Sequence, residues 1–162
     1  MRLDTSIGSL QLENPLILAS GITDMTADSM ERCCAAGAVV TKSIGKEERS
    51  GYGNPSVVEL EHGILNAMGL PNPGVDDYIE ELQDVDVDVV IGSIFGQTSA
   101  DFVAVAEKLA PHVAALELNM SCPHTGAYGA GVPTDRILGL VEAVKETVAV
   151  PIWVKLGTEN IL

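Results

Sequence analysis

An amide and a thiol follow each other closely where residues 118–124 read Leu-Asn-Met-Ser-Cys-Pro-His. An amide can donate and accept hydrogen bonds at the same time. A thiol has a pKa of about 8.5, which is close enough to neutral pH for the thiol to take part in proton transfer. The segment ends a short apolar run, 113–118, which favours a buried strand of a parallel sheet. Catalytic groups of α/β barrels project from the carboxyl ends of strands, so Asn119 and Cys122 stand where such folds place their working residues. Taken alone, Cys122 could equally be a buried structural cysteine.

Polar residues also recur at the ends of other apolar runs. Because side chains alternate between the two faces of a strand, certain neighbours share a face. The pairs are Glu117 with Asn119, Trp153 with Lys155, and Val40 with Lys42. We therefore expect three strand ends to converge on one ligand. An ion pair with Glu117 is the structural alternative for both lysines.

A regular alternation of short apolar runs and helical patterns would position these residues, and it predicts βα units. The expected strands are 16–19, 38–41, 87–94, 113–119 and 151–155, and the expected helices are 27–36, 75–82, 99–109 and 134–147. A hairpin that turns near Gly8 and Ser9 precedes them, and Ser99 is the expected cap of the third helix. The segment 42–74 is too long for a plain connection, and loops of this length are usually functional.

Five strands with intervening helices fit either a doubly wound sheet or the first part of an eight-stranded barrel. The recurrence of polar groups on one face favours the barrel. A complete barrel needs about 250 residues, whereas this chain has 162. We expect an α/β fold, a TIM (β/α)8 barrel truncated to about its first five β/α units with an N-terminal β-hairpin. Residues 1–162 would be the N-terminal portion of one such barrel domain.

Composition excludes several other classes of protein. The net charge of −14, from 23 acidic and 9 basic residues, disfavours nucleic-acid binding and indicates a solvated acidic surface. Cys33 and Cys34 fit no disulfide framework or zinc pattern, and we expect both in the core. His62, His112 and His124 show no metal-ligand spacing, so a metal-dependent barrel enzyme lacks support. With neither a spanning apolar stretch nor a signal peptide, a soluble cytoplasmic protein is expected.

Four motifs occur in a defined order, at residues 14–21, 37–43, 65–74 and, as Asn-x-Ser-Cys-Pro, 119–123. A fifth, Val-Lys-Leu at 154–156, follows them in the correct place. Together they resemble the dihydroorotate dehydrogenases, flavin enzymes of pyrimidine synthesis built on an eight-stranded barrel. The resemblance covers essentially the whole chain.

This resemblance implies FMN-dependent oxidation of (S)-dihydroorotate to orotate in de novo UMP synthesis, with hydride passing to FMN and Cys122 as the base. The implied FMN contacts are Ser20, Gly21, Lys42, Ser43, Ser93, Asn119 and Lys155. The implied substrate contacts are Lys42, Asn66, Ala67, Met68, Gly69, Leu70 and Asn119. Both lysines would place positive charge beside the reduced flavin, and Lys42 also beside the substrate carboxylate. A simple turn between Asn66 and Gly69, and a structural amide at Asn119, are the alternatives.

A cysteine base is typical of the soluble subclass, and the sequence of 66–74 is similar to that of the heteromeric, NAD-linked enzymes. That similarity implies a partner subunit carrying FAD and a 2Fe-2S cluster, since the chain has no four-cysteine pattern or dinucleotide glycine fingerprint of its own. A homo-oligomer is also expected. His124 is similar to the residue of dihydropyrimidine dehydrogenases, which act on uracil and thymine, so that alternative stays open. A non-catalytic half-barrel binding module is a further alternative, against which the retained Cys122, Asn119 and both lysines argue.

Overall fold

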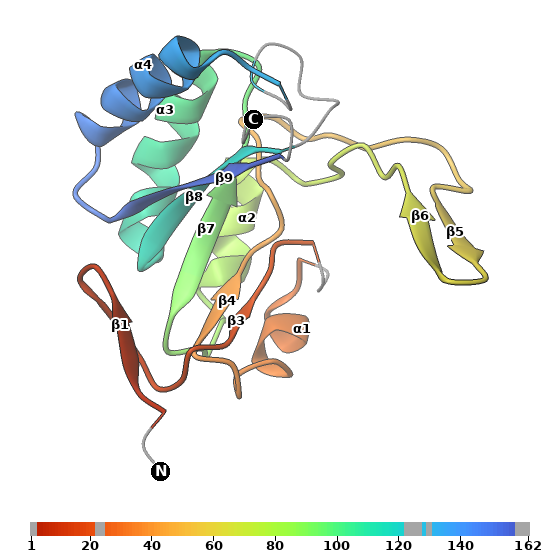
Figure 1. The fold of residues 1–162 in the computed structure, drawn as a ribbon, viewed down its shortest axis with the longest axis horizontal. Coiled ribbons are helices and arrows are strands. Elements are labelled where there is room, and N and C mark those ends of the chain that lie inside the picture. The colour runs from red at the N-terminus through yellow and green to blue at the C-terminus, as the bar shows by residue number, and fades with distance from the viewer. Residues whose placement is uncertain (1–2, 22–24, 122–127, 129–130, 158–162) are drawn as a thin grey trace.

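A computed structural model describes residues 3–21, 25–121, 128 and 131–157, and its centre is a curled parallel sheet (Figure 1). The strands are β3 (Ile17–Leu18), β4 (Ala38–Val40), β7 (Val90–Ile94), β8 (Ala115–Met120) and β9 (Ile152–Leu156). Their spatial order β3-β4-β7-β8-β9 follows the chain, so each connection leads to the adjacent strand. A doubly wound sheet reverses direction at a switch point, which this sheet does not do. The α/β prediction is confirmed, and the doubly wound alternative is wrong for the strands described.

Helices cover one face of this sheet (Figure 1). They are α1 (Ala27–Glu31), α2 (Val75–Leu82), α3 (Ser99–Leu109), the single turn η1 (Ala110–His112) and α4 (Thr134–Lys145). Tyr78, Phe102 and Leu140 from the three longest helices pack in one apolar cluster with Leu116 and Leu118 of β8. The helical face of the sheet is therefore its main hydrophobic core.

The opposite face, here called the inner face, is apolar only near the amino ends of the strands. Ala38, Ile91 and Ala115, each fully buried near a strand start, form a second cluster with Leu12. Leu12 belongs to the antiparallel hairpin of β1 (Thr5–Ile7) and β2 (Leu10–Leu12), whose turn contains Gly8 at a φ of +59°. The predicted N-terminal hairpin is confirmed, and it covers the amino end of the inner face.

The segment 42–74, predicted as a loop, contains a second hairpin that projects from the sheet (Figure 1). It pairs β5 (Val57–Leu60) with β6 (Gly63–Asn66). The four residues of β5 and the four residues of β6 are all exposed. A strand without a buried side leaves no alternation of apolar and polar residues, so the sequence pattern gave no signal for it.

Helix α1 is shorter than the predicted 27–36. After Glu31 the amides of Cys33 and Cys34 bond to carbonyls three residues earlier, and the helix becomes a series of tight turns. Cys33 is half-buried against the main core, but Cys34 is exposed, so the prediction that both lie in the core is wrong for Cys34.

Helix α3 begins as predicted, but its cap is Thr98 and not Ser99. The Thr98 hydroxyl accepts from the Asp101 amide at 3.2 Å, and the Asp101 carboxylate accepts from the Thr98 amide at 2.9 Å. This reciprocal capping box satisfies two amides that the helix itself leaves unpaired. The bonds also lower the pKa of the Asp101 carboxyl, against the opposing effect of its partial burial.

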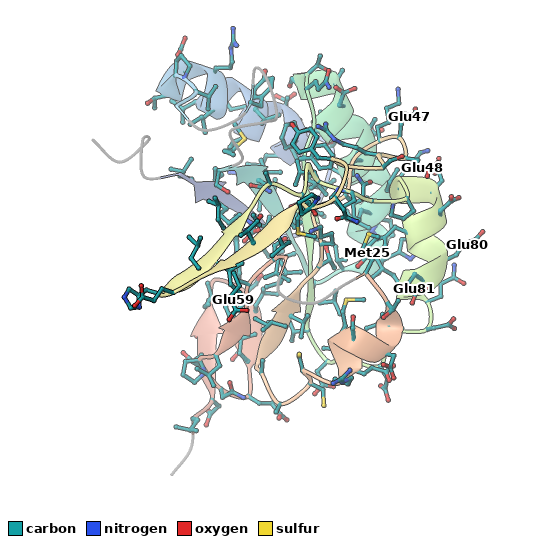
Figure 2. The ribbon with its side chains drawn as sticks, turned by 90° about the vertical axis from the view of Figure 1, so that its right-hand side faces the viewer. Met25, Glu47, Glu48, Glu59, Glu80 and Glu81 are labelled. Carbon is teal, nitrogen blue, oxygen red and sulfur yellow. The ribbon has the colours of Figure 1, made fainter. Side chains whose placement is uncertain are left out.

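The acidic surface is solvated, as predicted. Figure 2 shows Glu47, Glu48 and Glu80 at the periphery of the molecule and Glu59 on the projecting hairpin, and all four are exposed. Glu81 instead turns inward and accepts a 2.6 Å hydrogen bond from the Ala27 amide, which fastens the start of α1 to α2. Among the helices described, none has the length and apolar character that crossing a membrane requires.

Candidate functional site

Polar side chains collect at the carboxyl ends of the parallel strands, on the inner face. One comes from each strand or from the residues just after it, and β8 contributes two. They are Ser20, Ser43, Ser93, Glu117, Asn119 and Lys155. Residues far apart in the chain thus meet because parallel strands end at one edge of the sheet. The predicted meeting of the β8 and β9 ends is observed, but β4 joins them through Ser43 and not through the predicted Lys42, and β3 and β7 also contribute.

Ser43 reaches this group because the chain gains one residue after β4. Val40 is paired with Ile91, and the next pairing joins Ile44 to Ile94, so four steps along one chain match three along the other. Strict alternation from Val40 would send Ser43 to the helical face. The extra residue acts like a β-bulge and returns Ser43 to the inner face, while Ile44 enters the main core.

Hydrogen bonds connect the polar residues into one network, here called the strand-end network. Asn119 Nδ2 donates to Ser43 Oγ at 2.8 Å, and Ser43 Oγ lies 2.9 Å from Ser93 Oγ. Ser20 Oγ lies 3.4 Å from Ser43 Oγ. Ser43 is therefore the centre that joins the first four strands of the sheet.

Glu117 extends the network to the fifth strand. Its Oε1 accepts from Ser93 Oγ at 3.3 Å and lies 2.9 Å from Lys155 Nζ. The ion pair that the sequence offered as a structural alternative for Lys155 is thus formed. Only 12% of the Glu117 side chain is exposed, against 33% for Lys155, so the ammonium is the more accessible partner.

The amide of Asn119 is fixed in one orientation. Its Oδ1 accepts from Ser121 N at 3.2 Å and from Ser121 Oγ at 2.7 Å, while Nδ2 donates to Ser43. These partners assign the oxygen and nitrogen positions without ambiguity. Within the described residues, the second hydrogen of Nδ2 has no partner.

Lys42 differs from Lys155 in having no carboxylate within ion-pair distance among the residues described. It is half-buried, and desolvation lowers the pKa of its ammonium below the ordinary lysine value. A partly desolvated cation without a counter-ion favours the approach of an anion. Lys42 is therefore the residue of this region best prepared to bind a carboxylate or an anionic ring.

Cys122, the predicted base, lies outside the described residues. Gly21, the predicted FMN neighbour of Ser20, has a φ of +85°, which glycine adopts without strain.

The predicted substrate residues 66–70 follow the projecting hairpin. Ala67 N donates to Ser56 O at 2.8 Å, and Met68 O accepts from Tyr52 N at 2.9 Å. No backbone bond closes a turn between Asn66 and Gly69 within these described residues, so the simple turn is not observed. Asn66, Ala67 and Met68 are exposed, and none of the hydrogen bonds found in the described chain joins them to the strand-end network. The structure therefore groups Ser20, Ser43, Ser93, Asn119 and Lys155 of the FMN candidates but leaves these three substrate candidates apart.

The following two loop residues adopt left-handed backbone conformations. Gly69 has a φ of +78° and Leu70 a φ of +55°. Gly69 is also packed against Tyr52, where an added Cβ would approach the ring to 2.9 Å. Since a side-chain-bearing residue at this position would be strained and overcrowded, Gly69 fixes the shape of the loop.

Asn72 is a site-supporting residue that the sequence reading missed. Its side chain is buried, and Oδ1 accepts from Gly45 N at 3.1 Å and from Gly74 N at 3.0 Å. Nδ2 donates to Leu70 O at 3.0 Å. Asn72 thereby fastens the end of the 66–70 loop to the chain that leaves Ser43. The Asn-Pro-Gly sequence that it opens is a turn signal, and it could have identified this role.

Comparison with known proteins gives consistent results. A sequence profile of the dihydroorotate dehydrogenase family matches residues 2–160. The catalytic subunit of dihydroorotate dehydrogenase B (NAD(+)) from Pyrococcus horikoshii is 48% identical over 98% of this chain and 54% of its own length. The subunit of that name from Methanocaldococcus jannaschii is 45% identical over 98% of this chain and 55% of its own. The chain therefore spans about half the length of these curated relatives.

Among solved structures, the dihydroorotate dehydrogenase of Eimeria tenella in complex with ferulenol is similar at a TM-score of 0.78. Sequence identity is 21%, and the match covers 90% of this chain and 43% of the Eimeria chain. At this identity the likeness shows the fold.

Proposed function

Because the chain belongs to the dihydroorotate dehydrogenase family, we propose that it supplies the first five β/α units of an eight-stranded barrel that oxidises (S)-dihydroorotate to orotate in de novo pyrimidine synthesis. The observation that carries the proposal is the strand-end network, which unites residues of five parallel strands at the edge where barrels place their active sites. Residues 1–162 would be part of a single flavin-binding domain.

The donor set of the network, together with Lys42 next to Ser43 in the chain, fits FMN. Asn119 offers an amide hydrogen, and Lys42 and Lys155 offer positive charge, which suit the carbonyl groups and the anionic pyrimidine portion of a reduced flavin. The residues proposed to hold it are Ser20, Gly21, Lys42, Ser43, Ser93, Asn119 and Lys155. FMN supplies the hydride acceptor that no side chain can provide.

Cys122 is proposed as the base that takes the proton from dihydroorotate. Its neighbour Ser121 gives two hydrogen bonds to Asn119 Oδ1, so the backbone that leads to the thiol is anchored to the network. A thiol of ordinary pKa, about 8.5, is only a few per cent ionised at pH 7. Flavin reduction by substrate should therefore become faster as the pH rises towards that value.

Lys42 and Asn119 are proposed to bind the substrate together with Asn66, Ala67, Met68, Gly69 and Leu70. Lys42 would pair with the substrate carboxylate, because a desolvated ammonium gains most from an anion. The anchoring of the 66–70 loop through Asn72 to Gly45, two residues after Ser43, supports a shared site.

The relatives are named catalytic subunits of an NAD(+)-linked enzyme, which implies a second subunit in those proteins. We infer for this protein a cytoplasmic homo-oligomer that passes electrons to an iron-sulfur flavoprotein partner holding FAD and a 2Fe-2S cluster. The purified protein should reduce NAD slowly alone and rapidly with that partner.

The decisive experiment mixes the full-length, FMN-loaded protein anaerobically with dihydroorotate and, separately, with dihydrouracil, and follows the flavin absorbance. Bleaching by dihydroorotate alone supports the proposal. Bleaching by dihydrouracil would instead support a dihydropyrimidine dehydrogenase, the alternative suggested by His124. Bleaching by neither would leave a non-catalytic binding module.

A cysteine variant tests the mechanism in the same assay. Cys122→Ala should slow flavin reduction by about 10²- to 10⁴-fold, the usual contribution of a general base, while FMN stays bound. Cys34→Ala is the matched control, because that thiol is exposed. An unchanged rate in Cys122→Ala would remove this thiol from the mechanism.

A further inference from the structure

Glu117 connects the Lys155 ammonium to the serine hydroxyls of the strand-end network, yet the proposed function assigns it no role. Its carboxylate is the only acidic group among the described residues of that network. Only 12% of the Glu117 side chain is exposed, so partners must compensate the cost of burying its negative charge. Lys155 Nζ at 2.9 Å and Ser93 Oγ at 3.3 Å provide that compensation through a single oxygen, Oε1.

The carboxylate also determines the direction of the serine hydroxyls. A carboxylate only accepts, so Ser93 must give its one proton to Glu117. Ser93 is then an acceptor towards Ser43, which must give its own proton to Ser93. Ser43 in turn accepts from Asn119 Nδ2 and from Ser20. All the hydroxyl protons therefore point along one path towards Glu117.

This polarity decides what the network presents to a ligand. Ser20 has used its proton within the network, so its oxygen is left as an acceptor. Lys155 has one of its three N–H groups directed to Glu117 and keeps the others as donors. Asn119 keeps one amide hydrogen that has no partner in the described part of the chain. The result is a fixed pattern of one acceptor and two kinds of donor.

We propose that Glu117 is a positioning residue of the cofactor site: it holds the Lys155 ammonium in place and directs the Ser93, Ser43 and Ser20 hydroxyl protons into the network, so that the Ser20 oxygen is presented to a flavin ring as an acceptor. This inference rests on the proposed function. Glu117 acts through Lys155 and Ser93 and is not itself a catalytic residue. A purely structural ion pair would serve stability alone and would have no effect specific to flavin binding.

The first test needs no flavin. Full-length apoprotein is treated with a limiting amount of acetic anhydride, and acetylation of Lys155 relative to exposed Lys145 is measured by peptide mass spectrometry. Glu117→Gln removes the charge but keeps the shape, so Lys155 should be acetylated several-fold faster than in the wild type. Glu80→Gln, an exposed change on α2, is the matched control and should leave the ratio unchanged.

The second test is a double-mutant cycle on FMN affinity, measured by quenching of flavin fluorescence. Glu117→Gln should weaken FMN binding about 10- to 100-fold, the range for loss of one charge-assisted interaction. In the Lys155→Met background the same substitution should have a much smaller effect, because one of its two routes of action is already gone. Thermal unfolding of each apoprotein separates this effect from a general loss of fold.

The outcomes separate the two claims. Faster Lys155 acetylation together with a non-additive cycle supports the inference. Unchanged acetylation, or equal effects of Glu117→Gln on FMN binding in both backgrounds, would overturn it while leaving FMN binding by the wild type intact. A wild type that binds no FMN would overturn the proposed function and the cofactor role of Glu117, even if the acetylation difference remained.

Discussion

Two lysines at one edge of the sheet are in different electrostatic states. Lys155 is 2.9 Å from Glu117, whereas Lys42 has no such partner in the described part of the chain and its ammonium is partly desolvated. The charge of Lys155 is thus partly balanced by Glu117, whereas that of Lys42 has no such counter-charge among the described residues. The two residues should therefore respond differently to substitution and to pH.

Lys42 should make binding of an anionic ligand sensitive to moderately alkaline pH. Desolvation lowers the pKa of its ammonium, so the charge is lost on the alkaline side at a lower pH than for an exposed lysine. Orotate affinity, measured by titration calorimetry, should fall as the pH rises through that lowered pKa. Lys42→Met should weaken orotate binding about 10- to 100-fold at neutral pH and remove this pH dependence.

The same substitution should not reduce stability. A lysine whose folded pKa is depressed destabilises the fold while it is protonated, and this cost disappears only above its unfolded pKa of about 10.4. Lys42→Met should therefore keep or raise the free energy of unfolding at pH 7. Lys145→Met, on an exposed position of α4, should alter neither property. A Lys42→Met protein that binds orotate normally would contradict the assignment.

Strand ends predicted Glu117, Asn119 and Lys155 of the network, and the family resemblance added Ser20, Ser43 and Ser93. Ser20, Ser43, Ser93, Asn119 and Lys155 were all expected at one site, and the structure brings them together. Their connections were not predictable, because strict alternation cannot show the extra residue after β4 that turns Ser43 inward. The place of Cys122, outside the described residues, stays a prediction.

At the scale of elements, Asn72 links the segment that follows β4 to the segment between β6 and α2. Asn72→Ala would leave the amides of Gly45 and Gly74 and the Leu70 carbonyl without their partner. Since a buried unsatisfied group costs about 1–3 kcal/mol, we expect a loss on the order of 3 kcal/mol in the free energy of unfolding. Urea denaturation of the purified protein measures this loss.

Substitutions of Asn72 should also affect function. Asn72→Asp keeps both accepted hydrogen bonds but buries a carboxylate against the Leu70 carbonyl oxygen, so its stability should also fall and the loop end should be freed. If residues 66–70 contact the substrate, KM for dihydroorotate should rise in both variants. Gln83→Ala, which changes an exposed amide after α2, is the control. Normal stability in Asn72→Ala would show that the loop is held by other contacts.

Elements with one buried side were predictable, and those without one were not. Helix α2 has the predicted bounds because its apolar residues recur on one face and Gly74 precedes it. The β5–β6 hairpin was missed because both its faces are exposed. The cap of α3 was placed one residue late, because Thr98 and Ser99 are both good caps and only the reciprocal bond with Asp101 distinguishes them.

At the scale of the whole molecule, net charge opposes folding. A charge of −14 on 162 residues places acidic groups close together, as at the exposed Asp84, Asp86 and Asp88. The surface ion pair of Lys108 with Asp76 offsets little of this repulsion, since exposed pairs contribute about 0–1 kcal/mol. Self-repulsion of exposed charges is screened by salt, whose Debye length is about 10 Å at 0.1 M and about 3 Å at 1 M.

Raising NaCl from low concentration to about 1 M should therefore raise Tm by several degrees, because each kcal/mol moves Tm by about 2–4 °C at this size. Salt can also stabilise proteins by strengthening apolar burial, so a charge variant must separate the causes. Replacing Asp84, Asp86 and Asp88 by Asn should raise Tm at low salt and reduce the further gain from NaCl. Apolar burial is untouched by these exposed substitutions, so an equal salt response in variant and wild type would assign the stabilisation to the core and not to the acidic surface.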